Sequence, residues 1–207
     1  KILRTNALRV FKLAPAGEGP KVPAVLQKPG PLHDWWRLHK SKEGFVKSWQ
    51  VIGPFETGEG LDQELPPEKN IDFNQSYSGL GGQVNWQPAE ASSAGYLNFI
   101  AHFARTQPDS RAGSIGMVYA YTEIESPDDR QTTLTIGSND GAKVWLNGKV
   151  IHNDKGGHNA VADRDILSVK LHSGINRLLV KVQNLGASWG LYLRVVDSDG
   201  KLKYKIF

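Results

Sequence analysis

The chain has 207 residues, of which 39% are hydrophobic and 22% charged, enough for one substantial domain with a remainder. This balance excludes a largely disordered chain, and no apolar run approaches the roughly 20 residues that cross a bilayer. Because cysteine is absent, disulfides, thiolate metal sites and a cysteine nucleophile are excluded. The chain begins at Lys1 without a visible leader peptide, and we expect a mature chain or, preferably, a piece of a longer polypeptide.

The net charge of +4 is unevenly distributed along the chain. Residues 1–52 hold ten Lys and Arg against three Asp and Glu, a net charge of +7, and the remaining residues carry a net charge of −3. The body of the chain lacks basic residues interleaved with aromatic ones, so nucleic-acid binding is not expected. We expect the basic arm to be a solvated segment that packs on an upstream domain.

The N-terminal arm reads as helix, linker and helix. Apolar residues at helical spacing predict a short helix over residues 2–13. Five prolines and three glycines in residues 14–31 predict an extended linker, and a second short helix follows over residues 32–41 and stops at Gly44. The sequence therefore divides into an arm, residues 1–44, and a module, residues 45–207.

From Phe45 onward the apolar residues recur with a period of two. The pattern predicts strands at Val46–Ile52, Asn85–Gln87, Tyr96–Phe99, Gly116–Ile124, Gln131–Gly137, Ala142–Leu146, Lys149–His152, Ile166–Leu171, Arg177–Gln183 and Trp189–Val196. Asn147-Gly148 predicts a type I′ hairpin. Without helices between the strands, we expect an all-β fold, an antiparallel β-sandwich of jelly-roll type, with binding residues on the long polar loops 53–83 and 153–164.

Several runs resemble a known family. They are WQVIGPF (49–55), GSNDGAKVWLNGK (137–149), LSVKL (167–171), GINRLLVKV (174–182) and WGLYLR (189–194). Over residues 45–200 the pattern is similar to the galactose-binding-like and protective-antigen-type β-sandwich modules of large bacterial extracellular proteins. The resemblance implies an extracellular or periplasmic, non-catalytic accessory module that binds an oligosaccharide or polysaccharide and holds it near a partner domain.

The resemblance also bears on calcium. In the sugar-binding members of the protective-antigen type, two successive acidic residues ahead of a glycine hold a calcium ion that coordinates sugar hydroxyls. The matching pair here is Asn139-Asp140, which has one charge fewer and should bind Ca²⁺ more weakly. A simple turn stabilised by these two side chains is equally open, and no cofactor is required.

The loop over residues 153–165 concentrates groups that hydrogen-bond sugar hydroxyls. We expect His152, His158 and Arg164 to bind ligand, and Arg164 could clamp an acidic sugar through two hydrogen bonds. Asp163 and Asp165, together with Asp140, are candidate metal ligands. A turn with a surface ion pair is the alternative for the Asp163–Asp165 run.

A saccharide site also needs an exposed aromatic ring. Burial is the default for Trp86, Trp145, Trp189 and Tyr96, which lie in or beside predicted strands. Trp189 is the best candidate for exposure because it follows the loop 186–188 at the edge of the sandwich. We therefore expect Trp189 to stack on sugar if any of these rings does.

No catalytic pattern is visible in the sequence. The histidines lack the spacing of a zinc protease, there is no Gly-x-Ser-x-Gly run, and the carboxylates lie where solubilising residues are common. We expect a chain that is not an enzyme. The alternative to sugar binding is a structural or interaction domain that docks onto neighbouring domains.

Overall fold

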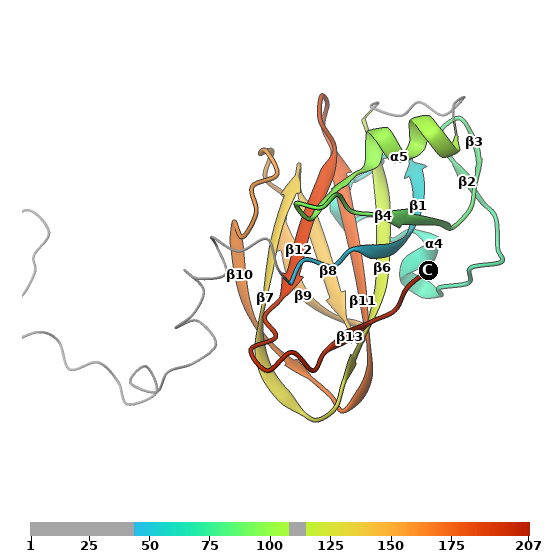
Figure 1. The fold of residues 1–207 in the computed structure, drawn as a ribbon. Coiled ribbons are helices and arrows are strands. Elements are labelled where there is room, and N and C mark those ends of the chain that lie inside the picture. Colours follow the sequence, from blue (N-terminus) through green and yellow to red (C-terminus); the bar gives the residue numbers. More distant parts are fainter. Residues whose placement is uncertain (1–43, 108–114) are drawn as a thin grey trace, which may run out of the picture.

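The structure is a computed structural model that describes residues 44–107 and 115–207. The expected N-terminal helices and linker lie outside these ranges, and the domain division at residue 44 stays a prediction. Within the described ranges the chain is an all-β sandwich of two antiparallel sheets, which confirms the predicted fold class (Figure 1).

The larger sheet has the strand order β4-β1-β6-β11-β8-β9, with β13 pairing β6. The smaller sheet has the order β10-β7-β12-β5, and β2 and β3 form a separate hairpin. The strands are β1 (Ser48–Phe55), β2 (Tyr77–Gly79), β3 (Gly82–Val84), β4 (Gln87–Glu90), β5 (Tyr96–Asn98), β6 (Gly116–Ser126), β7 (Arg130–Asn139), β8 (Ala142–Leu146), β9 (Lys149–Asp154), β10 (Asp165–Leu171), β11 (Gly174–Asn184), β12 (Gly190–Val195) and β13 (Lys203–Tyr204).

Alternating side chains build the core between the sheets. Leu178, Val180 and Val182 of β11 point inward and are fully buried, as their spacing predicts. The hairpin between β8 and β9 turns at Asn147 and Gly148, whose φ angles of 53° and 78° are those of a type I′ turn. The predicted type I′ hairpin is therefore confirmed.

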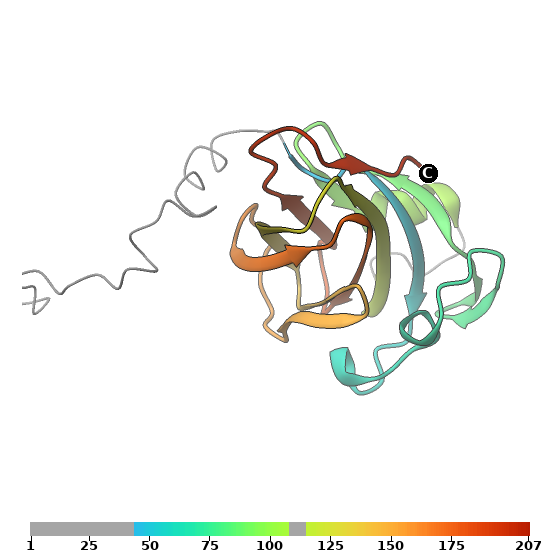
Figure 2. The same cartoon turned by 90° about the horizontal axis from the view of Figure 1, so that it is seen from below.

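The outer face of the larger sheet carries a second apolar cluster. It forms because residues 56–86, which we call the covering segment, fold back over β1, β6 and β11; Figure 2 shows this segment outside β1. The cluster joins side chains of the covering segment to others on the sheet: Ile52, Phe55, Leu61, Tyr77, Val84, Trp86, Met117, Tyr119, Tyr121 and Leu179. The expectation of a long polar loop over residues 53–83 was thus wrong, because its apolar residues cover the sheet.

Short helices interrupt the β-pattern, contrary to the expectation of strands alone. The covering segment holds a 3-10 turn, η2 (Gly60–Asp62), and a helix, α4 (Pro66–Lys69), and α5 (Phe99–Thr106) follows β5. Asn98 caps α5 by accepting a hydrogen bond from the Ala101 amide at 2.9 Å, so the predicted strand ends there. In the described ranges, the helices are all too short and too polar to traverse a lipid bilayer.

The predicted strand Asn85–Gln87 lies two residues later in the structure, as β4. β4 is an edge strand of the larger sheet, and edge strands are where a proline such as Pro88 is tolerated within a sheet.

Candidate functional site

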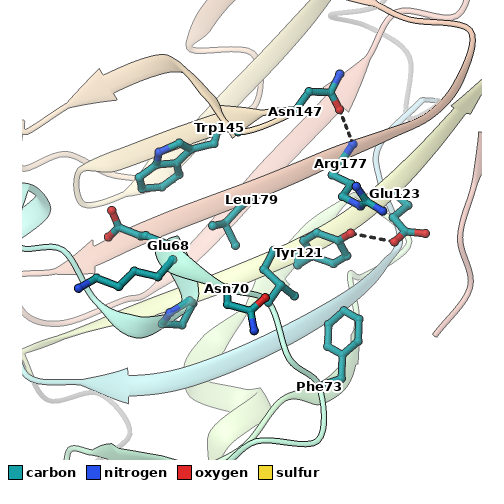
Figure 3. A pocket seen from close by; sticks show the side chains of 13 residues that line it. Glu68, Asn70, Phe73, Tyr121, Glu123, Trp145, Asn147, Arg177 and Leu179 are labelled. Carbon is teal, nitrogen blue, oxygen red and sulfur yellow. Dashed lines mark hydrogen bonds between the residues drawn. The ribbon is translucent and has the colours of Figure 1, made fainter.

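A groove of about 690 Å³ lies on the outer face of the larger sheet, beside residues 67–73 of the covering segment (Figure 3). Its floor comes from three neighbouring strands. Tyr121 of β6 and Trp145 of β8 are both directly opposite Leu179 of β11 in the sheet register. These three side chains form one row across the sheet, and Arg177 and Glu123, also a direct pair, form the next row.

The covering segment forms the wall of the groove. Pro66 and Pro67 start α4, since proline suits the first helical turn, and Asn70 ends the helix. Asn70, Ile71 and Phe73 then face the groove from one side, and the Asn147-Gly148 turn borders it on the other.

Buried charges hold the wall in place. Lys181 of β11 is fully buried and pairs with the Glu68 carboxylate of α4 at 2.9 Å. Lys181 also donates to the backbone oxygens of Leu61 and Gln63, and the Tyr119 hydroxyl donates to Glu68 at 2.5 Å. Burial lowers the pKa of Lys181, an effect that its ion pair with Glu68 opposes. The pair therefore fixes α4 to the sheet, at the cost of burying a lysine.

Aromatic rings lie at both ends of the groove. Trp145 is partly exposed, with the Lys143 ammonium 5.1 Å from its ring centroid. Phe73 is 38% exposed and packs edge-on against Trp86 and Tyr121. Figure 3 shows Trp145 and Phe73 on opposite sides of the labelled residues, with Leu179 and Tyr121 between them. Flat apolar surface is thus available to a ligand along the groove.

Polar groups converge on the same space. The Tyr121 hydroxyl donates to Glu123 at 2.8 Å, and Lys205 lies 3.1 Å from the other oxygen of Glu123. Burial alone would raise the pKa of Glu123, but the hydrogen bonds from Tyr121 and Lys205 outweigh it and hold this pKa below its usual value. Glu123 is therefore an anion at neutral pH and acts as a hydrogen-bond acceptor.

The turn that borders the groove is rigid. Asn147 Oδ1 accepts from the Arg177 amide at 2.8 Å, and Asn147 Nδ2 donates to Asn176 at 2.9 Å. The backbone of Arg177 is thereby held, while its guanidinium is exposed at the groove. Such preorganised polar groups around apolar surface are typical of small-ligand sites.

Trp189, the expected stacking residue, is fully buried. Its ring packs against Phe99 and Phe103 of α5, with centroid distances of 5.8 and 6.0 Å. The interpretation of Trp189 as a sugar-binding residue was wrong, because α5, which the sequence did not reveal, covers it. The default expectation of burial was the right one for this residue.

Asp163, an expected metal ligand, is buried in an ion pair with Arg194. Arg194 Nε donates to Asp163 at 2.7 Å, and the Thr135 hydroxyl donates to the same carboxylate at 2.6 Å. The expectation that Asp163 and Asp165 share a cation was therefore wrong. Asp165 instead lies beside Arg164, at 3.1 Å, and near His152, at 3.8 Å.

Asn139 and Asp140, the expected calcium pair, lie at the end of β7. Asn139 Oδ1 is buried and has no hydrogen-bond partner among the described residues, while Asp140 accepts a hydrogen bond from the Leu185 amide at 2.6 Å. An unpaired amide oxygen beside a carboxylate fits the oxygen ligands that Ca²⁺ prefers. These two residues would hold the ion, and calcium binding at this pair stays a prediction.

His158 and Arg164, two of the expected ligand-binding residues, are brought together. Arg164 Nη1 lies 2.5 Å from His158 Nε2 and donates to Asp154 at 2.7 Å. His152 is beside them on β9. This cluster is separate from the groove, which none of the predicted site residues lines.

Sequence reasoning missed the residues of the groove. Trp145 was assigned to the core, and Glu123 was interpreted as an ordinary solubilising carboxylate. The available signal was the alternation in β8 and β11, which places Trp145 and Leu179 on the face opposite to the core. The alternation alone could not identify the groove, because the covering segment buries part of the same face and the sequence does not show which part stays open.

No protein-family model and no curated protein sequence matches the chain. Among solved structures, one match is an anti-sigma factor domain-containing protein from Clostridium clariflavum, with 11% identity over 76% of this chain and a TM-score of 0.42. The chain spans 44% of that protein.

Two further matches are PA14 domains. The PA14 sugar-binding domain of an RTX adhesin has 14% identity, covers 79% of this chain and 95% of its own, and has a TM-score of 0.45. The PA14 domain of the antifreeze protein MpAFP has 8% identity, with 77% and 85% coverage and a TM-score of 0.46. At TM-scores below 0.5 these similarities carry no functional argument, so the function must be inferred from the groove itself.

Proposed function

We propose that the groove binds a saccharide, and that the chain is a non-catalytic carbohydrate-binding module. The observation that carries this proposal is the row of Trp145, Leu179 and Tyr121 beside the Arg177–Glu123 row. A sugar ring has an apolar C–H face and a polar rim of hydroxyls. The first row offers aromatic and aliphatic surface to that face, and the second offers a donor and an acceptor to the rim.

The state of the two carboxylates supports binding without catalysis. Glycoside hydrolysis needs one carboxylic acid with a raised pKa opposite a second carboxylate. Glu123 has a lowered pKa, and Glu68 is held by Lys181 and Tyr119. Both groups therefore act as hydrogen-bond acceptors, and Glu123 is not the raised-pKa acid that hydrolysis needs. We extend the proposal to an extracellular or periplasmic module that keeps polysaccharide near a partner domain.

The proposal is tested by affinity electrophoresis and calorimetry with a panel of neutral and acidic polysaccharides and their oligosaccharides, with and without Ca²⁺. Trp145→Ala should reduce the affinity for a bound saccharide by roughly tenfold or more, since it removes the main stacking surface. Asn70→Ala should also weaken binding, because Asn70 is exposed on the groove wall.

The matched control is Asn74→Ala. Asn74 is an exposed residue of the same type, four positions further along and outside the groove lining. It should bind like the wild type. If the Asn70 and Asn74 variants bind the saccharide with equal affinity, and Trp145→Ala binds it as tightly as the wild type, the groove is not the binding site.

A docking domain is the second candidate function. It is favoured by Ile175 and Ile206, which are 61% and 86% exposed and offer apolar surface to a neighbouring domain. No binding across the whole saccharide panel would favour this alternative.

A further inference from the structure

A second cluster of chemical groups lies where the edges of the two sheets approach each other. His152 and Asp154 belong to β9, the edge strand of the larger sheet, and Asp165 begins β10, the edge strand of the smaller sheet. His158 and Arg164 come from the loop that connects β9 to β10. The cluster thus draws residues from both layers of the sandwich.

Lone-pair donors converge on a single point in this cluster. Arg164 Nη1 lies 2.7 Å from Asp154 Oδ2, 3.1 Å from Asp165 Oδ2 and 2.5 Å from His158 Nε2. One ligand atom each from His152, Asp154 and Asp165 lies within 4.8 Å of the others. A guanidinium nitrogen therefore lies between one imidazole, that of His158, and two carboxylates, and His152 lies near the same carboxylates.

The tautomer of His158 is fixed from outside the cluster. His158 Nδ1 lies 2.9 Å from the backbone oxygen of Ser138, which can only accept, so Nδ1 carries the hydrogen. In the neutral ring, Nε2 then presents a lone pair 2.8 Å from Asp154 Oδ2. Two lone pairs this close repel each other unless a cation lies against both of them, and the Arg164 guanidinium is the cation in that place in this structure.

This arrangement matches the way proteins prepare histidine for a metal. A metal-bound histidine usually donates its other ring N–H to a carbonyl or carboxylate, which fixes the tautomer and the ring orientation. Ser138 performs this role for His158.

We propose that His152, Asp154, His158 and Asp165 form a binding site for a divalent transition-metal ion, with Zn²⁺ as the reference ion, and that the metal displaces the Arg164 side chain. Two imidazole nitrogens favour a transition metal over Ca²⁺, which prefers oxygen ligands alone. A tetrahedral zinc ion holds its ligand atoms roughly 3.3 Å apart. Here the ligand atoms of His158 and Asp154 lie 2.8 Å apart, and those of His152 and Asp165 lie 3.8 Å apart. The Arg164 side chain is 33% exposed and can leave toward solvent.

Metal binding would join the two sheets at their open edge. β9 and β10 are not hydrogen-bonded to each other, so an ion held by residues of both strands would add a link between the layers. Because the ligands come together only in the folded chain, binding would raise the melting temperature in proportion to the logarithm of the zinc concentration.

The test is isothermal titration of the full chain with zinc chloride, alongside thermal melting at several zinc concentrations. The wild type should bind one ion per chain, and His158→Ala should weaken binding by about tenfold or more. Arg164→Ala should bind zinc more tightly than the wild type, because it removes the competing cation. If His158→Ala does not fold, His152→Ala replaces it as the ligand variant. It removes a proposed ligand on the edge strand β9 and should also weaken zinc binding.

The matched control is His172→Ala. His172 is exposed and lies 3.7 Å from Asp129, outside the cluster, so its loss should leave zinc binding unchanged. Three results would overturn the proposal: no stoichiometric binding up to about 1 mM zinc, an equal loss in the His172 variant, or no gain in the Arg164 variant. The last result would mean that Arg164 is a permanent partner of the two carboxylates.

Discussion

At the scale of single residues, the buried ion pair between Asp163 and Arg194 is the clearest case of one contact deciding local stability. Arg194 is 1% exposed, and its guanidinium also lies 4.6 Å from the centroid of the Phe45 ring. Removing one partner of such a pair leaves a charge without compensation in an apolar environment. Removing Asp163 or Arg194 should therefore lower the free energy of unfolding far more than breaking an ion pair on the surface does.

We predict that Asp163→Ala lowers the free energy of unfolding by about 3–5 kcal/mol, measured by chemical denaturation. The control is Glu125→Ala, which removes an exposed pair with Lys203 at 3.9 Å and should cost less than about 0.5 kcal/mol. A loss below about 1 kcal/mol for Asp163→Ala would show that Arg194 finds other compensation.

His102 makes a second prediction at this scale, one that depends on pH. It is 4% exposed, and neither ring nitrogen has a hydrogen-bond partner among the described residues. Burial, aided by Arg105, lowers its pKa from 6.5 to about 4. As the pH falls through this window the unfolded chain takes up a proton that the native chain does not, so stability is lost.

The predicted loss between pH 6.5 and 4 is about 3 kcal/mol in the free energy of unfolding, present in the wild type and absent in His102→Leu. Denaturation curves measured across this pH range compare the two proteins. If the free energy of unfolding depends on pH in the same way in the wild type and in His102→Leu, then His102 keeps its usual pKa.

At the scale of elements, two glycines test how tightly the loops are fitted to the strands. A Cβ at Gly137 of β7 would lie 1.8 Å from the backbone oxygen of Val161, in the loop that carries His158 and Arg164. At Gly148 a Cβ would meet nothing within 4 Å, and only the φ angle of 78° opposes a side chain. The first position is crowded and the second is merely strained.

Gly137→Ala should lower the free energy of unfolding by roughly 2 kcal/mol or more and displace the loop, whereas Gly148→Ala should cost about 1 kcal/mol. Thermal or chemical denaturation of both variants provides the measurement. Equal costs at the two positions would mean that the β9–β10 loop moves freely away from β7.

At the scale of the whole molecule, the sandwich was predictable because its core strands alternate cleanly. Leu178, Val180 and Val182 indicate the inner face of β11 without reference to any other segment. The outer face was not predictable in the same way. The alternation in β11 predicts that Lys181 faces solvent. In the structure it is buried, because the covering segment lies over it and pairs it with Glu68.

The candidate site was less predictable than the fold for the same reason. Its floor joins Tyr121, Trp145 and Leu179, which come from three strands and meet only through the sheet register. His158 and Arg164 were expected to bind ligand, which stays a prediction; the structure brings their side chains together, as their closeness in sequence allows. Trp189 could not be placed, because its burial depends on a helix that the β-pattern conceals.

The central claim is that the outer face of the larger sheet recognises saccharide. The most direct test is to follow the tryptophan indole N–H signals of the nitrogen-15-labelled chain by NMR while a saccharide that binds is added. The Trp145 signal should move with the ligand concentration, while those of the buried Trp86 and Trp189 stay in place. A stationary Trp145 signal, with shifts confined to the backbone amides of the loop around His158 and Arg164, would contradict the claim.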